Sequence, residues 1–97
     1  SKILELCVDE NNFLLRSGVG WREGLIGKAK INTGHLSQAG FTLISTEPVI
    51  VNDFASETRF SKSQLFVEHD VVSGVSVVIH CQERPFGILG AHSKSPR

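Results

Sequence analysis

The chain has few cysteines, no excess of either charge and no long apolar run, and each shortage excludes a class of protein. Ten basic residues balance ten acidic ones without any Lys/Arg run, so the basic surface of nucleic-acid and anionic-membrane binders is missing. The longest apolar stretch, Val75–Ile79, is interrupted by Ser76 and falls far short of the roughly 20 residues of a membrane-spanning helix. No signal-peptide pattern opens the sequence. These absences predict a cytoplasmic protein with no nucleic-acid partner and no direct membrane contact.

The two cysteines, Cys7 and Cys81, lie far apart in the sequence. They show none of the short spacings that make zinc or redox sites. Both fall in predicted strands, and we expect two buried, reduced thiols. A bridge between neighbouring strands is the alternative, if their geometry permits it.

Motifs for catalysis are also missing. The chain has no Ser-His-Asp order, no phosphate-binding loop and no close pair of carboxylates. Its composition, 40% hydrophobic and 21% charged, is that of an ordinary globular protein, and 97 residues suffice for one core. The sequence therefore predicts a single globular domain that is not an enzyme.

Alternating apolar residues and turn residues predict an antiparallel sheet. An apolar run that follows the turn residues 9–12 predicts a β-hairpin near the start of the chain, and a second hairpin turns at 82–85. Pro48 precedes a β-branched run that ends at Asn52. The expected strands are Ile3–Val8, Phe13–Ser17, a short one near Ala29–Ile31, Val49–Val51, Val71–Cys81 and Phe86–His92.

Two short helices are expected between the strands. Apolar residues spaced at helical intervals predict one over residues 36–44, with Thr33 or Ser37 as its cap. The second is expected over Lys62–His69, because Ser61 and Gln64 match a capping box and Phe60 and Leu65 match a hydrophobic staple.

Both faces of the long strands are apolar, with Val75, Val77, Ile79 and Cys81 on one face and Val78 on the other. Such a sheet needs cover on both sides. The two predicted helices can cover only one. We therefore expect an exposed apolar face, to be covered by helices outside residues 1–97 or by a second copy of the chain.

Five stretches in register resemble a known family. They are SGVGW (17–21), SQAGFTLISTEPVIVNDF (37–54), ETRF (57–60), EHDVVSGVSVVI (68–79) and PFGILGAHSKSPR (85–97), and in order and spacing they resemble the GAF domains of bacterial sensor histidine kinases and diguanylate cyclases. The resemblance implies an α+β, GAF-like (profilin-like) fold with a central antiparallel sheet of five to six strands and connecting helices on one face. It also implies a single domain over residues 1–97, truncated at both ends, with the terminal helices missing.

The resemblance implies a regulatory function. A GAF domain binds a small ligand, forms a homodimer through its sheet face or terminal helices, or does both, to control an output domain such as a histidine kinase. A ligand-free dimerisation spacer and a thiol-dependent enzyme that reduces methionine sulfoxide remain as alternatives. The ligand pocket implied by the family lies between sheet and helices, and the candidate residues are Phe41, Asp53, Phe54, Arg59, Phe60, Leu65, Val75 and Val77.

Two ligand classes, bilins and cyclic nucleotides, are disfavoured, and we predict no cofactor and no metal. Ser63 and Gln64 stand where bilin-binding relatives carry a Cys-His pair, and Asn52-Asp53-Phe54 has the wrong order for a cyclic-nucleotide signature. The aromatic candidates are also expected as core, and Arg59 can brace its own loop with Asp53 or Glu57. The histidines are expected at the surface or in hydrogen bonds rather than on a metal: His35, His69, His80 and His92.

Overall fold

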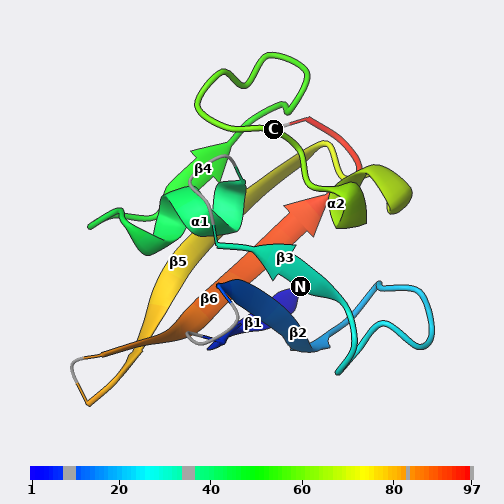
Figure 1. The fold of residues 1–97 in the computed structure, drawn as a ribbon. Coiled ribbons are helices and arrows are strands. Elements are labelled where there is room, and N and C mark those ends of the chain that lie inside the picture. Colours follow the sequence, from blue (N-terminus) through cyan, green and yellow to red (C-terminus); the bar gives the residue numbers. More distant parts are fainter. Residues whose placement is uncertain (8–10, 34–36, 83, 97) are drawn as a thin grey trace.

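A six-stranded antiparallel sheet forms the body of the molecule. The computed structural model describes residues 1–7, 11–33, 37–82 and 84–96. The strands follow the order β3-β2-β1-β6-β5-β4, and all neighbours are antiparallel (Figure 1). The strands are β1 Lys2–Cys7, β2 Asn12–Gly18, β3 Lys30–Asn32, β4 Val49–Val51, β5 Ser73–Cys81 and β6 Arg84–Ser93. The expected α+β fold with five to six antiparallel strands is confirmed.

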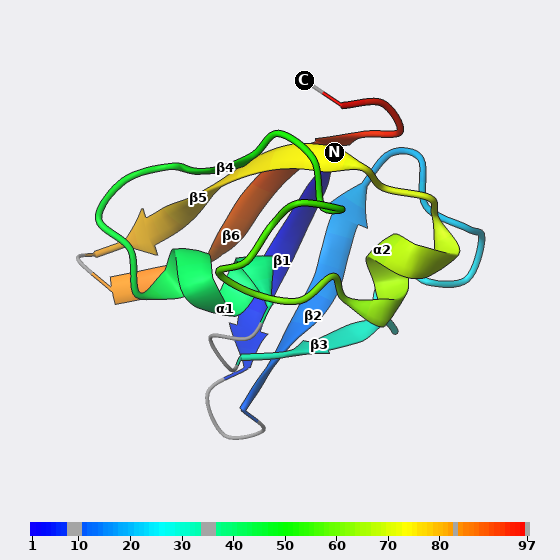
Figure 2. The same ribbon diagram turned by 90° about the horizontal axis from the view of Figure 1, so that it is seen from above.

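Two short helices, α1 (Gln38–Leu43) and α2 (Gln64–Glu68), lie on one face of this sheet (Figure 2). The predicted cap of α1 is confirmed at Ser37, whose hydroxyl accepts a hydrogen bond from the Gly40 amide at 3.0 Å. Thr42 of α1 shares a hydrogen bond with Ser76 of β5, with 2.6 Å between the two hydroxyl oxygens, so this bond fixes α1 on the sheet.

The capping box predicted for α2 is wrong. Ser63, not Ser61, caps the helix by accepting from the Phe66 amide at 3.3 Å. Ser61 instead forms an isolated parallel bridge with Ser37, which holds the chain extended and delays the helix start. The staple also fails, because Phe60 and Leu65 belong to different buried clusters.

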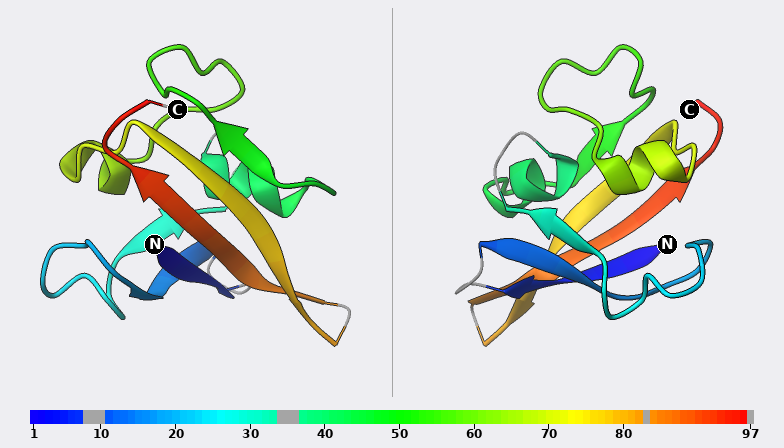
Figure 3. Two further views of the ribbon diagram at one scale, coloured as in Figure 1. Left: turned by 180° about the vertical axis from the view of Figure 1, so that it is seen from behind. Right: turned by 45° about the vertical axis from the view of Figure 1, so that its right-hand side comes forward.

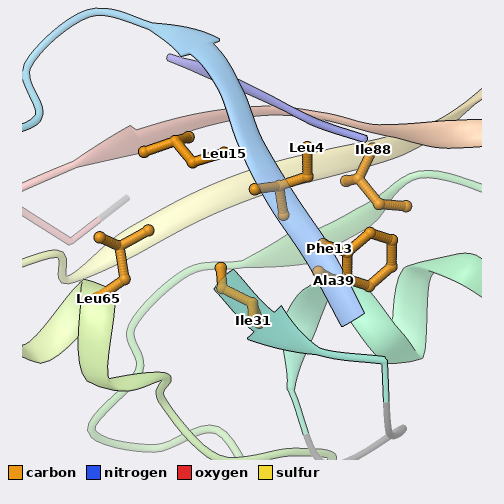
Figure 4. Close-up of a cluster of buried hydrophobic side chains, with 7 residues drawn as sticks. All are labelled: Leu4, Phe13, Leu15, Ile31, Ala39, Leu65 and Ile88. Atoms are coloured by element: carbon orange, nitrogen blue, oxygen red, sulfur yellow. The ribbon is translucent and has the colours of Figure 1, made fainter. Parts of the chain in front are cut away.

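The larger buried cluster lies between the sheet and the helices. Leu4 and Ile88 from the central strands β1 and β6 are fully buried there with Phe13 and Leu15 of β2. The cluster is completed by one side chain each from β3, α1 and α2, as Figure 4 shows: Ile31, Ala39 and Leu65. Deep burial of apolar side chains from every layer is the main source of stability for a domain of this size.

The opposite face of the sheet, the open face, is apolar and uncovered. Among the described residues no helix lies over it (Figure 3). Strand register places Ile3, Leu89 and Val77 in one cross-strand row and Ile50, Val75 and Ala91 in another. Leu89 is 46% exposed and Ile50 is 53% exposed. The exposed apolar face expected from the strand pattern is therefore present.

Both cysteines are free, but their expected burial is wrong. Cys7 is half-buried and Cys81 is exposed. Cys81 ends β5 beyond the point where β4 pairs with it, since that pairing reaches only Ser76.

Neither helix in the described part of the chain is long and apolar enough to cross a membrane.

Candidate functional site

The predicted aromatic candidates form a packed cluster beside β4. The Phe60 ring lies 5.3 Å from that of Phe41 and 6.3 Å from that of Phe54, measured between centroids. Together with Val49 and Val51 they make the second buried cluster. Side chains fill the space between these rings, so this part of the predicted pocket serves as core.

The predicted charged candidate Arg59 pairs with Glu57, not with Asp53. The Nη2 atom of Arg59 lies 2.6 Å from Glu57 Oε1. It also donates a hydrogen bond to the Ile50 carbonyl at 2.6 Å. The guanidinium lies 5.3 Å from the Phe60 ring centroid. The hydrogen bonds from Arg59 hold the pKa of Glu57 down at about 2. Asp53 instead accepts from the Ala55 amide at 2.9 Å, which closes a local turn. The ion pair between Arg59 and Glu57 therefore holds the loop after β4 in place.

Replacement of Glu57 by glutamine tests this brace. The depressed pKa means that Glu57 stabilises the fold fully above its ordinary pKa of 4.5, and that this contribution is lost as pH falls towards 2. Because Arg59 is 41% exposed, solvent screens the pair, and Glu57→Gln should lower the free energy of unfolding at neutral pH by about 1 kcal/mol. Urea unfolding at pH 7, 4 and 3 should show the gap between the two proteins narrowing. Glu23→Gln, in an exposed loop, is the control, and a gap that stays constant with pH contradicts the brace.

The other candidates are not brought to this cluster. Leu65 lies in the larger core. Val75 and Val77 flank Ser76, whose hydroxyl contacts α1, so their side chains point to the open face. Their assignment to a pocket under the helices is corrected by this alternation. An open hollow of about 350 Å³ does lie at the rim of the aromatic cluster, lined by Phe41, Arg59 and the segment 44–49.

A second site, which the sequence analysis missed, lies at the other end of the helix-covered face. Lys2 is only 2% exposed, and its ammonium lies 3.9 Å from the Phe66 ring centroid and 6.0 Å from that of Trp21. The His92 ring lies 4.4 Å from Phe66 and 6.3 Å from Trp21, and His69 lies 5.0 Å from Trp21. We call these five residues the lysine site.

The charge of Lys2 is uncompensated by any described acid. No described carboxylate lies within ion-pair distance of its ammonium. Burial lowers the pKa of Lys2 well below its ordinary value. The pKa of His92 falls to about 3, first because of burial and then because of the nearby Lys2 charge. His92 is therefore a neutral ring at physiological pH.

The two histidines of the lysine site differ in their hydrogen bonds. His69 uses both nitrogens: Nε2 accepts from the Arg22 amide at 2.8 Å, so Nδ1 carries the proton and donates to the Leu65 carbonyl at 2.8 Å. Both nitrogens of His92 are buried, and neither has a partner among the described residues. Unsatisfied buried polar atoms are rare in folded proteins and need an explanation.

Two glycines allow the His92 ring to lie against the sheet. A Cβ on Gly74 would overlap His92 Nδ1, and one on Gly90 would stand 2.8 Å from His92 Nε2 and 3.2 Å from Lys2 Cε. The side chains of Lys2 and His92 therefore both lie beside Gly90.

One signal in the sequence could have revealed this site. Lys2 and the buried Leu4 lie two residues apart on the same face of β1, where a charged residue is unexpected.

A smaller hollow of about 120 Å³ opens beside the lysine site. Its lining includes Trp21, His69, Val71, His92 and Lys94.

Within the described residues, no group of three or more His, Cys, Asp or Glu side chains is placed to hold a metal ion. His80 is exposed, and His35 lies outside the described residues. The lysine site thus combines a buried cation, an imidazole and aromatic walls.

The sheet order, the helices on one face and the matched sequence settle the family. The model of the GAF domain matches residues 3–97. The chain belongs to the GAF family. GAF domains are generally regulatory or sensory domains. No curated protein sequence matches the chain significantly.

Solved structures of GAF domains share this fold. The GAF domain of phosphoenolpyruvate-protein phosphotransferase from Acinetobacter superposes with a TM-score of 0.78 at 18% identity, over 99% of this chain and 54% of that one. The GAF domain of the corresponding enzyme (ptsP) from Coxiella burnetii gives 0.78 at 20% identity, over 96% and 55%. Free methionine-R-sulfoxide reductase from Neisseria meningitidis, in complex with its substrate, gives 0.70 at 14%, over 97% and 51%. The chain therefore spans about half the length of these structures.

Proposed function

We propose that this GAF domain is a sensory module that pairs with a second copy through its open face, binds a small ligand under its helices, and so controls an output domain such as a histidine kinase. The observation that carries the pairing is the apolar open face, where Leu89 and Ile50 stand about half exposed among valine and isoleucine neighbours. A continuous exposed apolar surface on a folded domain marks an interaction site.

A second copy is an occupant that fits this face. The middle rows of this face are uncharged, so two copies can bury the same residues against each other in a symmetric pair. A ligand can act on such a pair only through different affinity for two of its arrangements. Two free thiols fit a reducing compartment, and we propose a cytoplasmic location for the module.

Replacement of Leu89 by glutamate tests the pairing. Leu89 lies between Ile3 and Val77 in the middle of the open face, so a buried carboxylate there should weaken the dimer at least about tenfold, as expected for about 1.4 kcal/mol or more of desolvation cost. Val67→Glu is the matched control, because Val67 is 50% exposed on α2, on the helix-covered side. Sedimentation velocity over a concentration series measures both variants. A protein that is monomeric at every concentration, or equal effects of the two variants, contradicts the proposal.

Specific contacts bear on the two alternative functions, a ligand-free dimerisation spacer and a thiol enzyme. The filled aromatic cluster around Phe60 favours a dimerisation spacer without a ligand, whereas the unsatisfied polar groups of the lysine site favour a ligand. The likeness to the methionine sulfoxide reductase, at 14% identity, concerns the fold. A thiol enzyme is disfavoured because Cys7 and Cys81 end strands β1 and β5 and line neither of the two hollows described above.

A further inference from the structure

We infer that the outer edge of β5 binds an extended peptide of a partner protein, which adds a strand to the sheet beside residues 77–81 and places a basic side chain near Glu47. We call the backbone edge of β5 from Val77 to Cys81, on the side away from β6, the free edge. The inference goes beyond the proposed function, because the free edge is distinct from the open face and needs no second copy of the chain.

β5 is longer than the strand that pairs with its outer side. It spans nine residues, Ser73–Cys81, whereas β4 spans three. Their pairing ends with Val49 opposite Ser76, and β5 continues beyond it (Figure 1). The residue that would continue the pairing is Pro48, which has no N–H to donate to a ladder and therefore ends the strand. No described residue pairs with the outer side of β5 at residues 77–81.

The free edge carries backbone groups that can bind a strand. In an antiparallel sheet, alternate residues direct their N–H and C=O groups to one neighbour, and the residues between them direct theirs to the other neighbour. β6 pairs with β5 as far as Cys81, so it satisfies one side of residues 77–81. On the other side these residues form no backbone hydrogen bond with any described residue. An unpaired edge of this kind is a template for an added strand.

A hollow of about 340 Å³ lies along the free edge. It is lined by Val77, Val78 and His80 of β5 and by the segment 45–48 that leads into β4. Val77 and Val78 are consecutive, so their side chains point to opposite faces of the sheet. A hollow that touches both lies at the edge of the strand rather than on either face. Its volume is in the range of ligand-binding pockets, so the edge has room for an extended chain.

The free edge lacks the features that normally protect an edge from an added strand. Natural proteins protect such edges with very short strands, with lysine or with proline. The opposite edge of the sheet follows this rule, because β3 has three residues and one of them is Lys30. Residues 77–81 read Val-Val-Ile-His-Cys, without lysine, proline or an acid. Their sequence therefore permits pairing with a further strand.

A single peptide fits the free edge better than a second copy of the chain. The segment 45–48 walls the hollow beside residues 77–80. A symmetric pair joined at this edge would bring the 45–48 segments of both copies over the same few rows of the sheet, whereas a peptide brings no such segment. Glu47 is exposed and forms no ion pair with a described residue, so a lysine or arginine of the peptide can pair with it.

The test is a titration of isotope-labelled protein with a capped peptide of alternating valine and threonine that has a lysine at each end. Backbone amide NMR signals of residues 77–81 and 45–48 should shift and saturate. Bound peptide should slow the hydrogen exchange of the free-edge amides by about tenfold. A control peptide, N-methylated at every valine and threonine, keeps the side chains but has no N–H donors there. It should bind about tenfold more weakly, because it loses at least two backbone hydrogen bonds.

A charge reversal at Glu47 tests the orientation of the peptide against the segment 45–48. Glu47→Lys should weaken binding of the lysine peptide by about threefold, and should strengthen binding of the same peptide with glutamate at each end. Glu23→Lys is the matched control, since Glu23 is an exposed acid in the loop between β2 and β3, at the other edge of the sheet. It should leave both affinities unchanged.

Each remaining outcome counts against the inference. It is overturned by the absence of saturable shifts at residues 77–81, by equal binding of the N-methylated peptide, or by equal effects of Glu47→Lys and Glu23→Lys. If the free-edge amides are protected without peptide and lose that protection on dilution, a second copy occupies the edge, which overturns the peptide as occupant. Leu89→Glu, on the open face, should bind the peptide with unchanged affinity, so failure of the proposed pairing and failure of this inference are seen separately.

Discussion

Replacement of Lys2 by methionine should stabilise the ligand-free protein by about 2 kcal/mol, which is roughly 10 °C in melting temperature for a domain of this size. Methionine keeps the length and the contact with Phe66 but removes the uncompensated ammonium. The variant loses the cation–π stabilisation but also removes the desolvation cost of the buried ammonium. The second free energy is the larger, because burial lowers the pKa of Lys2 well below its ordinary value.

The gain should depend on pH in a defined direction. The folded protein holds Lys2 at a pKa below its ordinary 10.5, so stability is lost as pH falls from 10.5 towards the folded pKa. The advantage of Lys2→Met is therefore present at pH 7 and shrinks as pH rises towards 10.5. Denaturant unfolding at pH 7 and pH 10 measures it, with Lys94→Met as the control. A variant that is less stable than the unmutated protein at pH 7 would mean that Lys2 already has a polar partner.

Replacement of Gly87 by alanine should destabilise the fold by about 3 kcal/mol, the upper range for an overpacked site. A Cβ on Gly87 would overlap the Leu4 carbonyl oxygen and stand 3.1 Å from Glu5 Cα, and both obstacles are backbone atoms of the neighbouring strand β1. No side-chain rotation relieves this contact. The central strands β1 and β6 must move apart, which weakens the ladder that joins the two halves of the sheet.

Gly90→Ala is the matched comparison, three residues further along β6. The atoms in its way are the far ends of Lys2 and His92, which can shift, so this variant should lose less stability than Gly87→Ala. Thermal unfolding of both variants, with amide exchange of β1, measures the difference. If the two variants lose the same stability, the close approach of Gly87 to Leu4 is not the cause. Any side chain added at a glycine of β6 would then have the same cost.

The sheet could be predicted because its signals are local. A β-branched run after Pro48 gives β4, and turn residues between two alternating runs give each hairpin. The sequence alone does not locate the cap of α2, because Ser61 and Ser63 carry the same hydroxyl. The choice between them was made by the contact of Ser61 with Ser37, on a distant part of the chain.

The candidate site was harder to predict because it depends on convergence. Lys2, Trp21, Phe66 and His92 come from β1, a loop, α2 and β6, and no spacing in the sequence brings them together. The sequence places Val75 and Val77 on the wrong face of the sheet because both faces of β5 are apolar. Burial of Ser76 against Thr42, a contact between two hydroxyls, decides which face lies under the helices.

The position of Trp21 makes the lysine site visible to optical spectroscopy without any attached label. It is the one tryptophan of the chain, which has no tyrosine, so near-ultraviolet emission excited above the phenylalanine band arises at a single ring. That ring forms a wall of the hollow, lies against Phe66 and His69, and stands 6.3 Å from His92. Fluorescence of the unmodified protein is therefore a local record of this site, whereas in most domains it averages over several parts of the fold.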